Sequence, residues 1–400
     1  MMGVVGAPFG LWLARHWAAI LVGVAVLQWG YGVYSPNVPK WLGLYLCSFV
    51  LGLALARRSE GGWRSFPPDA AALLLLLWMA LSLIWSPDWH EGLIRLQNAV
   101  TLFVIYLYFS RRGAVPWDAI AVTGIGLSLL RPDIFGGLGN TIFQSEFLLL
   151  LVPWCRWYVA IAVFVFLGVF EGATLSGDGG SDVVWPALGL WCLWVARKHV
   201  TPYRAALVPA LAASGYVMWA WGDWSALEFV MRSMSERAEI WTNTAYMVLD
   251  EPTRVLHGVG LGGFMYWYPF YQESHLALFD GTMMKGLTFF TNAVHNDWLQ
   301  IFAVLGGVGL ILALSFTRFL FLAKGNALFL LMAGLLMVFN FPLQNPASAA
   351  VVAMGCGAIN AIFAARSDAA DPRKWGVGVY WGMAHDKGKT GAHPKPACRI

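Results

Sequence analysis

One histidine stands where a polar segment passes into a long apolar run, and its position suggests acid–base chemistry. Residues 291–300 read TNAVHNDWLQ, so His295, Asn296 and Asp297 are expected at a membrane surface. An unperturbed imidazole has a pKa of about 6.5 and can take a proton from an attacking hydroxyl group near neutral pH. The simpler interpretation is a histidine that is hydrated among the lipid headgroups.

Arginine side chains upstream of this histidine could bind an anion. Arg237, Glu239 and Trp241 share a predicted helix, and Arg254 follows in the turn after it. A guanidinium group offers a rigid fork of donors that matches phosphate oxygens, and it can offset the charge on a departing pyrophosphate. The alternative at each position is an arginine that is solvated or that binds a lipid headgroup.

A glycine-rich segment, residues 258–264, lies between these groups and reads GVGLGGF. It superficially resembles a phosphate-binding loop, but the strand and helix of a dinucleotide fingerprint are missing. We predict a tight turn that lets the backbone approach a substrate or another helix closely, with Gly260 and Gly262 in that turn.

Several polar side chains interrupt the apolar runs themselves: Arg95, Gln97, Asn98, Asn140, Gln144 and Glu146. Polar groups inside a bilayer are costly, so these residues are expected to line a cavity or to bridge helices. Bridging is an equal alternative for Gln97, Asn98 and Gln144, whereas Arg95 and Glu146 are taken as candidates for substrate binding.

The elements that position these residues are predicted to be membrane-spanning helices. The 400-residue chain is 58% hydrophobic and only 12% charged, with a mean hydropathy of +0.61, which excludes an ordinary soluble domain. Apolar runs near the length of a bilayer-spanning helix recur, and no alternating strand pattern is present. We predict an all-α polytopic membrane protein with about twelve spans, near residues 16–34, 40–56, 69–86, 92–110, 116–130, 141–154, 157–175, 182–196, 203–222, 294–317, 325–343 and 347–365.

The distribution of basic residues sets the predicted orientation of these spans. Lys and Arg gather in alternate loops, whereas the intervening short loops are acidic or glycine-rich. Both termini are therefore expected in the cytoplasm, and the long loop 223–292 outside it. Within that loop, Ser233 and Glu236 have the spacing of a capping box, which predicts a helix from there to Leu249 with a buried stripe of Ile240, Trp241, Ala245 and Val248. The sequence from Asp250 to Pro252 should end that helix.

These predictions divide the chain into four parts. Nine spans occupy residues 1–222, an external catalytic loop 223–292, three spans 293–365, and a flexible cytoplasmic tail 366–400. The net charge of +4 does not indicate a nucleic-acid partner, because the basic residues are scattered in short loops. The five cysteines have no metal-ligand spacing, and we expect neither a metal nor a cofactor.

Taken in order, these features resemble the superfamily of O-antigen ligases and polymerases, membrane glycosyltransferases that use undecaprenyl-pyrophosphate-linked glycans. The resemblance covers most of the chain and rests on three motifs. They are Trp85-Ser86-Pro87-Asp88; Arg237-x-x-Ile240-Trp241 with the following Asp250-x-Pro252 and Gly258-x-Gly260-x-Gly262-x-Phe264; and His295-Asn296-Asp297-Trp298-Leu299-Gln300 followed by Gly306, Gly307 and Gly309.

The resemblance implies that Arg237 and His295 are essential to catalysis. It implies a metal-independent, inverting transfer at the periplasmic face of a bacterial inner membrane, from the undecaprenyl-pyrophosphate-linked donor to a hydroxyl group of lipid A core, a protein or another glycan. We take the following residues as candidates for binding substrate: Trp241, Arg254, Gly260, Gly262, Asn296, Asp297, Arg95 and Glu146.

One segment departs from the family pattern. Many members carry a Ser-Arg pair after the seventh span, whereas this chain has Ser176 followed by Gly177 and Asp178. A second cation for the pyrophosphate would have to come from Arg254, Arg95 or Lys285, or the activity is altered or lost.

The alternatives differ in reaction and in class. A ligase and a polymerase share the expected fold, and the compact chain with one dominant loop favours a ligase. A polysaccharide-lipid transporter is the alternative from another class, but no internal repeat is found and the polar residues gather toward the external face. A structural membrane scaffold would make the polar cluster around His295 incidental.

Overall fold

The computed structural model describes residues 6–27, 37–57, 66–112, 114–130, 141–174, 189–191, 225–275, 291, 293–323 and 325–370. Every regular element within these ranges is helical, as the sequence predicts. The α-helices are α1 Gly6–Leu27, α2 Asn37–Ala56, α3 Pro67–Leu81, α4 Trp89–Arg112, α5 Trp117–Leu130, α6 Thr141–Leu151, α7 Trp157–Thr174, α11 Ser225–Leu249, α12 Pro252–His257, α13 Gly263–His275, α14 Asp297–Leu322, α15 Ala327–Phe339 and α16 Pro346–Ala370. Two short 3₁₀ turns, η2 Ser82–Trp85 and η4 Val152–Trp154, follow α3 and α6.

Five of these helical segments are long and apolar enough to cross a membrane: Asn37–Ala56, Pro67–Trp85, Trp89–Arg111, Asp297–Leu322 and Pro346–Ala365. Shorter apolar helices lie at 11–26, 117–130, 143–154, 157–167 and 327–339. The described chain thus has the helices of an all-α membrane protein. Most of the expected eighth span, the whole ninth span and the tail beyond residue 370 lie outside the described residues.

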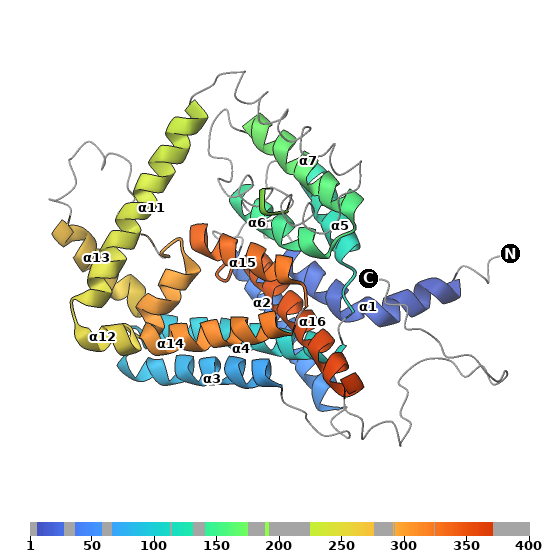
Figure 1. The fold of residues 1–400 in the computed structure, drawn as a ribbon, viewed down its shortest axis with the longest axis horizontal. Coiled ribbons are helices and arrows are strands. Elements are labelled where there is room, and N and C mark those ends of the chain that lie inside the picture. The colour runs from blue at the N-terminus through green and yellow to red at the C-terminus, as the bar shows by residue number, and fades with distance from the viewer. Residues whose placement is uncertain are drawn as a thin grey trace.

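The long apolar helices pack in pairs. Helix α14 lies along α3 (Figure 1), α16 packs against α4, and α2 contacts both α1 and α4. The helices α11, α12 and α13, which belong to the predicted external loop, pack against one another and against α14. The segment that is predicted to be external therefore packs on the helix that follows it in the sequence.

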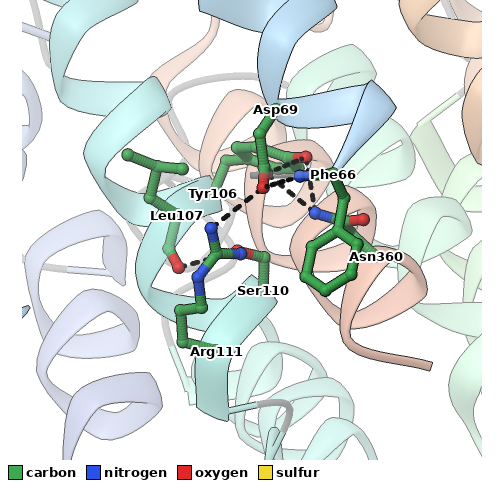
Figure 2. A network of polar contacts seen from close by, with 7 residues as sticks. All are labelled: Phe66, Asp69, Tyr106, Leu107, Ser110, Arg111 and Asn360. Carbon is green, nitrogen blue, oxygen red and sulfur yellow. Dashed lines mark hydrogen bonds and ion pairs between the residues drawn. The ribbon is translucent and has the colours of Figure 1, made fainter. Parts of the chain in front are cut away.

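A buried polar network ties α3, α4 and α16 together (Figure 2). Asp69 accepts hydrogen bonds from Tyr106 Oη at 2.8 Å and from Asn360 Nδ2 at 2.8 Å, and Arg111 lies 2.9 Å from its other carboxylate oxygen. The same carboxylate accepts the backbone N–H of Phe66, so it also caps the first turn of α3. Because both carboxylate oxygens of Asp69 are hydrogen-bonded, the free-energy cost of burying this charge among apolar helices is offset.

Helix α14 is broken at Gly306, whose backbone has φ 67° and ψ −168°. The break frees three carbonyl groups just before it, and each accepts a hydrogen bond from another segment. Val259 N donates to the carbonyl of residue 303 at 2.9 Å, Gly260 N to that of residue 304 at 3.0 Å, and Trp78 Nε1 to that of residue 305 at 2.9 Å. The glycine-rich segment therefore replaces part of the hydrogen bonding of the helix.

Gly258 and Gly260 allow the glycine-rich segment to contact α14 on one side and Ser86 on the other. A Cβ atom on Gly258 would lie 2.6 Å from Gly306 N, and one on Gly260 would lie 2.7 Å from the Cα atom of Ser86. Ser86 Oγ donates to the carbonyl of Leu261 at 2.6 Å. The predicted close approach to another helix is confirmed, and it joins the three sequence motifs in one place.

Helix α11 begins earlier than the sequence predicts. Ser233 and Glu236 lie inside a continuous helix that starts at Ser225, so the predicted capping-box start is wrong. The predicted stripe is confirmed in part: Ile240 and Val248 are buried, whereas Trp241 and Ala245 are only half-buried. The predicted end is also confirmed, since α12 begins at Pro252.

Candidate active site

The turn before α14 holds His295 in an uncommon backbone conformation. His295 has φ 55°, the left-handed region that non-glycine residues rarely adopt. Its neighbour Val294 is fixed from both sides, because Gln300 Oε1 accepts its N–H at 2.9 Å and Trp241 Nε1 donates to its carbonyl at 3.0 Å. Trp241 on α11 therefore positions the histidine turn through the backbone.

The next two residues fix the start of α14. Asn296 is the N-cap, and its Oδ1 accepts the N–H of Leu299 at 2.9 Å. Asp297 is 2% exposed, and its Oδ2 accepts the N–H of Leu343 at 2.8 Å. In this structure both side chains serve the local fold, and Asp297 in addition lines the cavity described below.

The His295 imidazole is half-buried, with its ring edge-on to Phe341 at a centroid distance of 4.7 Å. Burial and, to a smaller extent, the positive charge of Arg237 together lower the pKa of His295 to about 4. The imidazole is therefore neutral near pH 7 and can accept a proton.

Arg237 reaches this site from α11. It is 7% exposed, and one guanidinium nitrogen lies 3.4 Å from Asn340 Oδ1, just after α15. Its charge acts on both His295 and the carboxyl group of Glu146. The structure thus brings Arg237 and His295 together, although α12, α13 and further chain separate them in the sequence.

Glu146 on α6 is fully buried beside these residues. Its Oε2 lies 3.4 Å from Ser348 Oγ, and its charge interacts with those of Asp297 and Arg237. Two carboxyl groups and an arginine from three helices therefore share one buried polar region. The positive charge of Arg237 offsets part of the cost of burying Glu146, whereas the neighbouring Asp297 carboxyl group repels it.

Arg95, in the first turns of α4, lies near the start of α14. Its Nε atom is 2.6 Å from Glu91 Oε1, and NH1 donates to Gln344 Oε1 at 3.2 Å. Its charge also acts on the carboxyl group of Asp297. Arg95 therefore belongs to the polar region around His295.

Arg254 has a different environment. It is 9% exposed, with an ion pair to Glu251 at 3.1 Å and a hydrogen bond to Tyr271 Oη at 2.8 Å, and its guanidinium carbon lies 4.3 Å from the ring centroid of Trp267. These contacts hold α12 against α13. The structure places Arg254 in that contact and not beside His295.

The two glycines proposed for substrate binding lie mainly against protein. Gly260 packs on Ser86, and Gly262 packs so closely on the backbone of Asp88 and Gly92 that no Cβ could fit. Gly262 also lines the cavity described below. Their described contacts are thus close backbone packing against residues 86–92.

The sequence interpretation missed three amide side chains between α15 and α16: Asn340, Gln344 and Asn345. Asn340 contacts Arg237, Gln344 contacts Arg95, and Asn345 interacts with Glu146. The expected span 325–343 absorbed part of this segment. The available signal was a short segment between two apolar runs that holds Asn340 just before Pro342, and Gln344 and Asn345 between Pro342 and Pro346.

Two predictions fall on residues that the structure does not describe, namely Lys285 and the stretch around Ser176. Comparison with models of protein families, with curated proteins and with solved structures finds no match for this chain.

Proposed function

We propose that this chain is a ligase-like membrane glycosyltransferase that transfers a glycan from undecaprenyl pyrophosphate to an acceptor hydroxyl group. The observation that carries the proposal is the meeting of Arg237 and His295, the two residues that the resemblance marks as essential, in one buried polar region. In this proposal the protein lies in a bacterial inner membrane with about twelve spans, and residues 223–292 face the periplasm.

The proposed step is a single displacement at the sugar C1 atom. The acceptor oxygen forms a bond to C1 while the bond from C1 to the pyrophosphate oxygen breaks, which inverts the configuration. The hydroxyl proton passes to the neutral imidazole of His295. Arg237 stabilises the negative charge that develops on the departing undecaprenyl pyrophosphate.

The charge of Arg237 supports a change in the basicity of His295 when the donor binds. In this structure the positive charge of Arg237 helps to keep the pKa of His295 low. A bound pyrophosphate offsets that charge and raises the pKa of the imidazole. The histidine thus becomes a stronger base when the donor is in place.

A transporter is the second candidate, because α14 is broken at Gly306 and broken helices line substrate sites in many transporters. However, the carbonyl groups before the break accept hydrogen bonds from Val259, Gly260 and Trp78. The break therefore serves to dock the glycine-rich segment, which favours the transferase.

Turnover by the purified protein tests the proposal. The full chain in detergent receives an undecaprenyl-pyrophosphate-linked glycan together with lipid A core, a protein or a free glycan as acceptor. Wild type should release undecaprenyl pyrophosphate, and His295→Ala and Arg237→Ala should each lose about 100-fold or more of the rate. The acceptor that reacts separates a ligase from a polymerase.

Arg156→Gln is the matched control, because Arg156 is exposed and pairs with Asp118 far along the sequence from these residues. This variant should turn over like wild type. A rate that survives both His295→Ala and Arg237→Ala would overturn the proposal. A reporter fused near Gln272 should be active only outside the cytoplasm.

A further inference from the structure

A cavity of about 310 Å³ lies between α3, α4, α14 and α16. Most of its lining is apolar, from residues that include Leu75, Leu102, Phe103, Phe316 and Val352. All four helices contribute segments that are long and apolar enough to span a membrane. The apolar part of the cavity is therefore suited to a hydrocarbon chain within the bilayer.

One end of the cavity is polar. Glu91 and Arg95 come from the first turns of α4, Asp297 and Gln300 from the first turn of α14, and Gln344 from the turn before α16. The lining residues further along α4 and α16 are mostly apolar, with Asn98 and Tyr106 of α4 as the exceptions. An amphiphile whose head lies beside these residues therefore fits both parts of the lining.

Arg95 makes an anionic head suitable. A guanidinium group has five N–H donors, and the contacts with Glu91 and Gln344 engage two of them. The remaining donors can bind phosphate oxygens in the fork geometry. The head is also close to the proposed chemistry. Asp297 borders the cavity, and it follows His295 in the same turn.

From these observations we propose that the cavity binds the isoprenoid chain of a lipid-linked pyrophosphate and that Arg95 binds the pyrophosphate group. The inference rests on the proposed function and names where its donor lies. Arg95 then fills the role that the resemblance assigns to the arginine missing near Ser176. Arg254 cannot fill it, because Glu251, Tyr271 and Trp267 hold its guanidinium group elsewhere.

The occupant is a single-chain lipid and not an ordinary phospholipid. A volume of about 310 Å³ is at the small end of ligand cavities, which suits a segment of one chain. Glu91 repels an anionic head while it pairs with Arg95, so only a strongly charged head competes well for the guanidinium group. Pyrophosphate carries more charge than a phosphodiester.

Binding of undecaprenyl pyrophosphate to the full-length protein in detergent tests this inference without requiring turnover. Arg95→Gln should weaken binding about ten- to hundred-fold, and Glu91→Gln should strengthen it. Ala99→Phe, which fills the cavity from α4, should weaken binding at least about tenfold. Its matched control is Val100→Phe on the adjacent, 42% exposed position, which should bind like wild type.

The outcomes separate this inference from the proposed function. His295→Ala should lose turnover and keep the wild-type affinity for undecaprenyl pyrophosphate. If His295→Ala and Arg237→Ala abolish transfer while Arg95→Gln and Ala99→Phe bind the lipid like wild type, the inference is wrong and the proposed function stands. Equal displacement by phosphatidylglycerol would also overturn it, because the cavity would then accept any anionic lipid.

Discussion

Replacing Gly306 by alanine should destabilise the protein by several kcal/mol, because this glycine fulfils two requirements at once. Its φ of 67° and ψ of −168° lie in a region that only glycine occupies readily, which alone costs alanine about 1 to 3 kcal/mol. An added Cβ would also lie 2.5 Å from Gly258 N and collide with the carbonyl of Leu256. The glycine-rich segment must then move away from α14.

That movement determines the size of the effect. It breaks the two hydrogen bonds from Val259 N and Gly260 N to the carbonyl groups freed by the break. A buried carbonyl left without a partner costs about 1 to 3 kcal/mol. Strain and two orphaned carbonyls together give about 3 to 9 kcal/mol. Gly258→Ala should have a similar effect, and the double variant should cost less than the sum, because both disrupt one contact.

Unfolding of the detergent-solubilised protein by SDS, followed by far-ultraviolet circular dichroism, measures these differences. The control is Gly334→Ala in α15, where an added Cβ has no atom within 4 Å and a helical alanine gains up to about 1 kcal/mol. The reasoning is refuted if Gly306→Ala and Gly334→Ala unfold at the same SDS fraction.

Three further predictions concern His295, Trp241 and Asp69. Acidification from about pH 6.5 to about pH 4 should remove the stability that His295 contributes, taken as the difference between wild type and His295→Gln, because the unfolded chain protonates His295 below a pKa of about 6.5 and the folded chain only near about 4. The loss between these values approaches about 3 kcal/mol, measured as SDS midpoints, and it should shrink in Arg237→Gln, which raises the folded pKa; an unchanged loss would contradict this. Trp241→Phe removes the bond that fixes the histidine turn and should lower kcat about tenfold with little change in KM, and an unaltered kcat would refute that positioning role. Asp69→Asn should cost about 3 kcal/mol of stability by leaving a partly buried guanidinium group without its carboxylate, whereas Asp118→Asn at an exposed pair should cost less than about 1 kcal/mol; equal SDS midpoints would contradict this.

The sequence by itself determined the class of the protein and much of its local structure. An apolar run of sufficient length forms a helix whose backbone hydrogen bonds are all internal, so α2, α4 and α14 lie close to the predicted ranges. The end of α11 at Leu249 and the close approach of the glycine-rich segment were also predicted correctly. These features depend on residues that are near one another in the chain.

The tertiary structure decided how the polar groups are used. It engages Arg254 with α13, leaves Arg95 at a cavity, and sets Asn340 beside Arg237. In the structure α11 begins at Ser225, before the predicted cap. Helix α14 is broken at a position where other segments donate hydrogen bonds to the freed carbonyl groups. Helix formation follows from hydrogen bonds within one segment, whereas the partners of a buried charge come from several helices, and their packing is not written in any single run of residues.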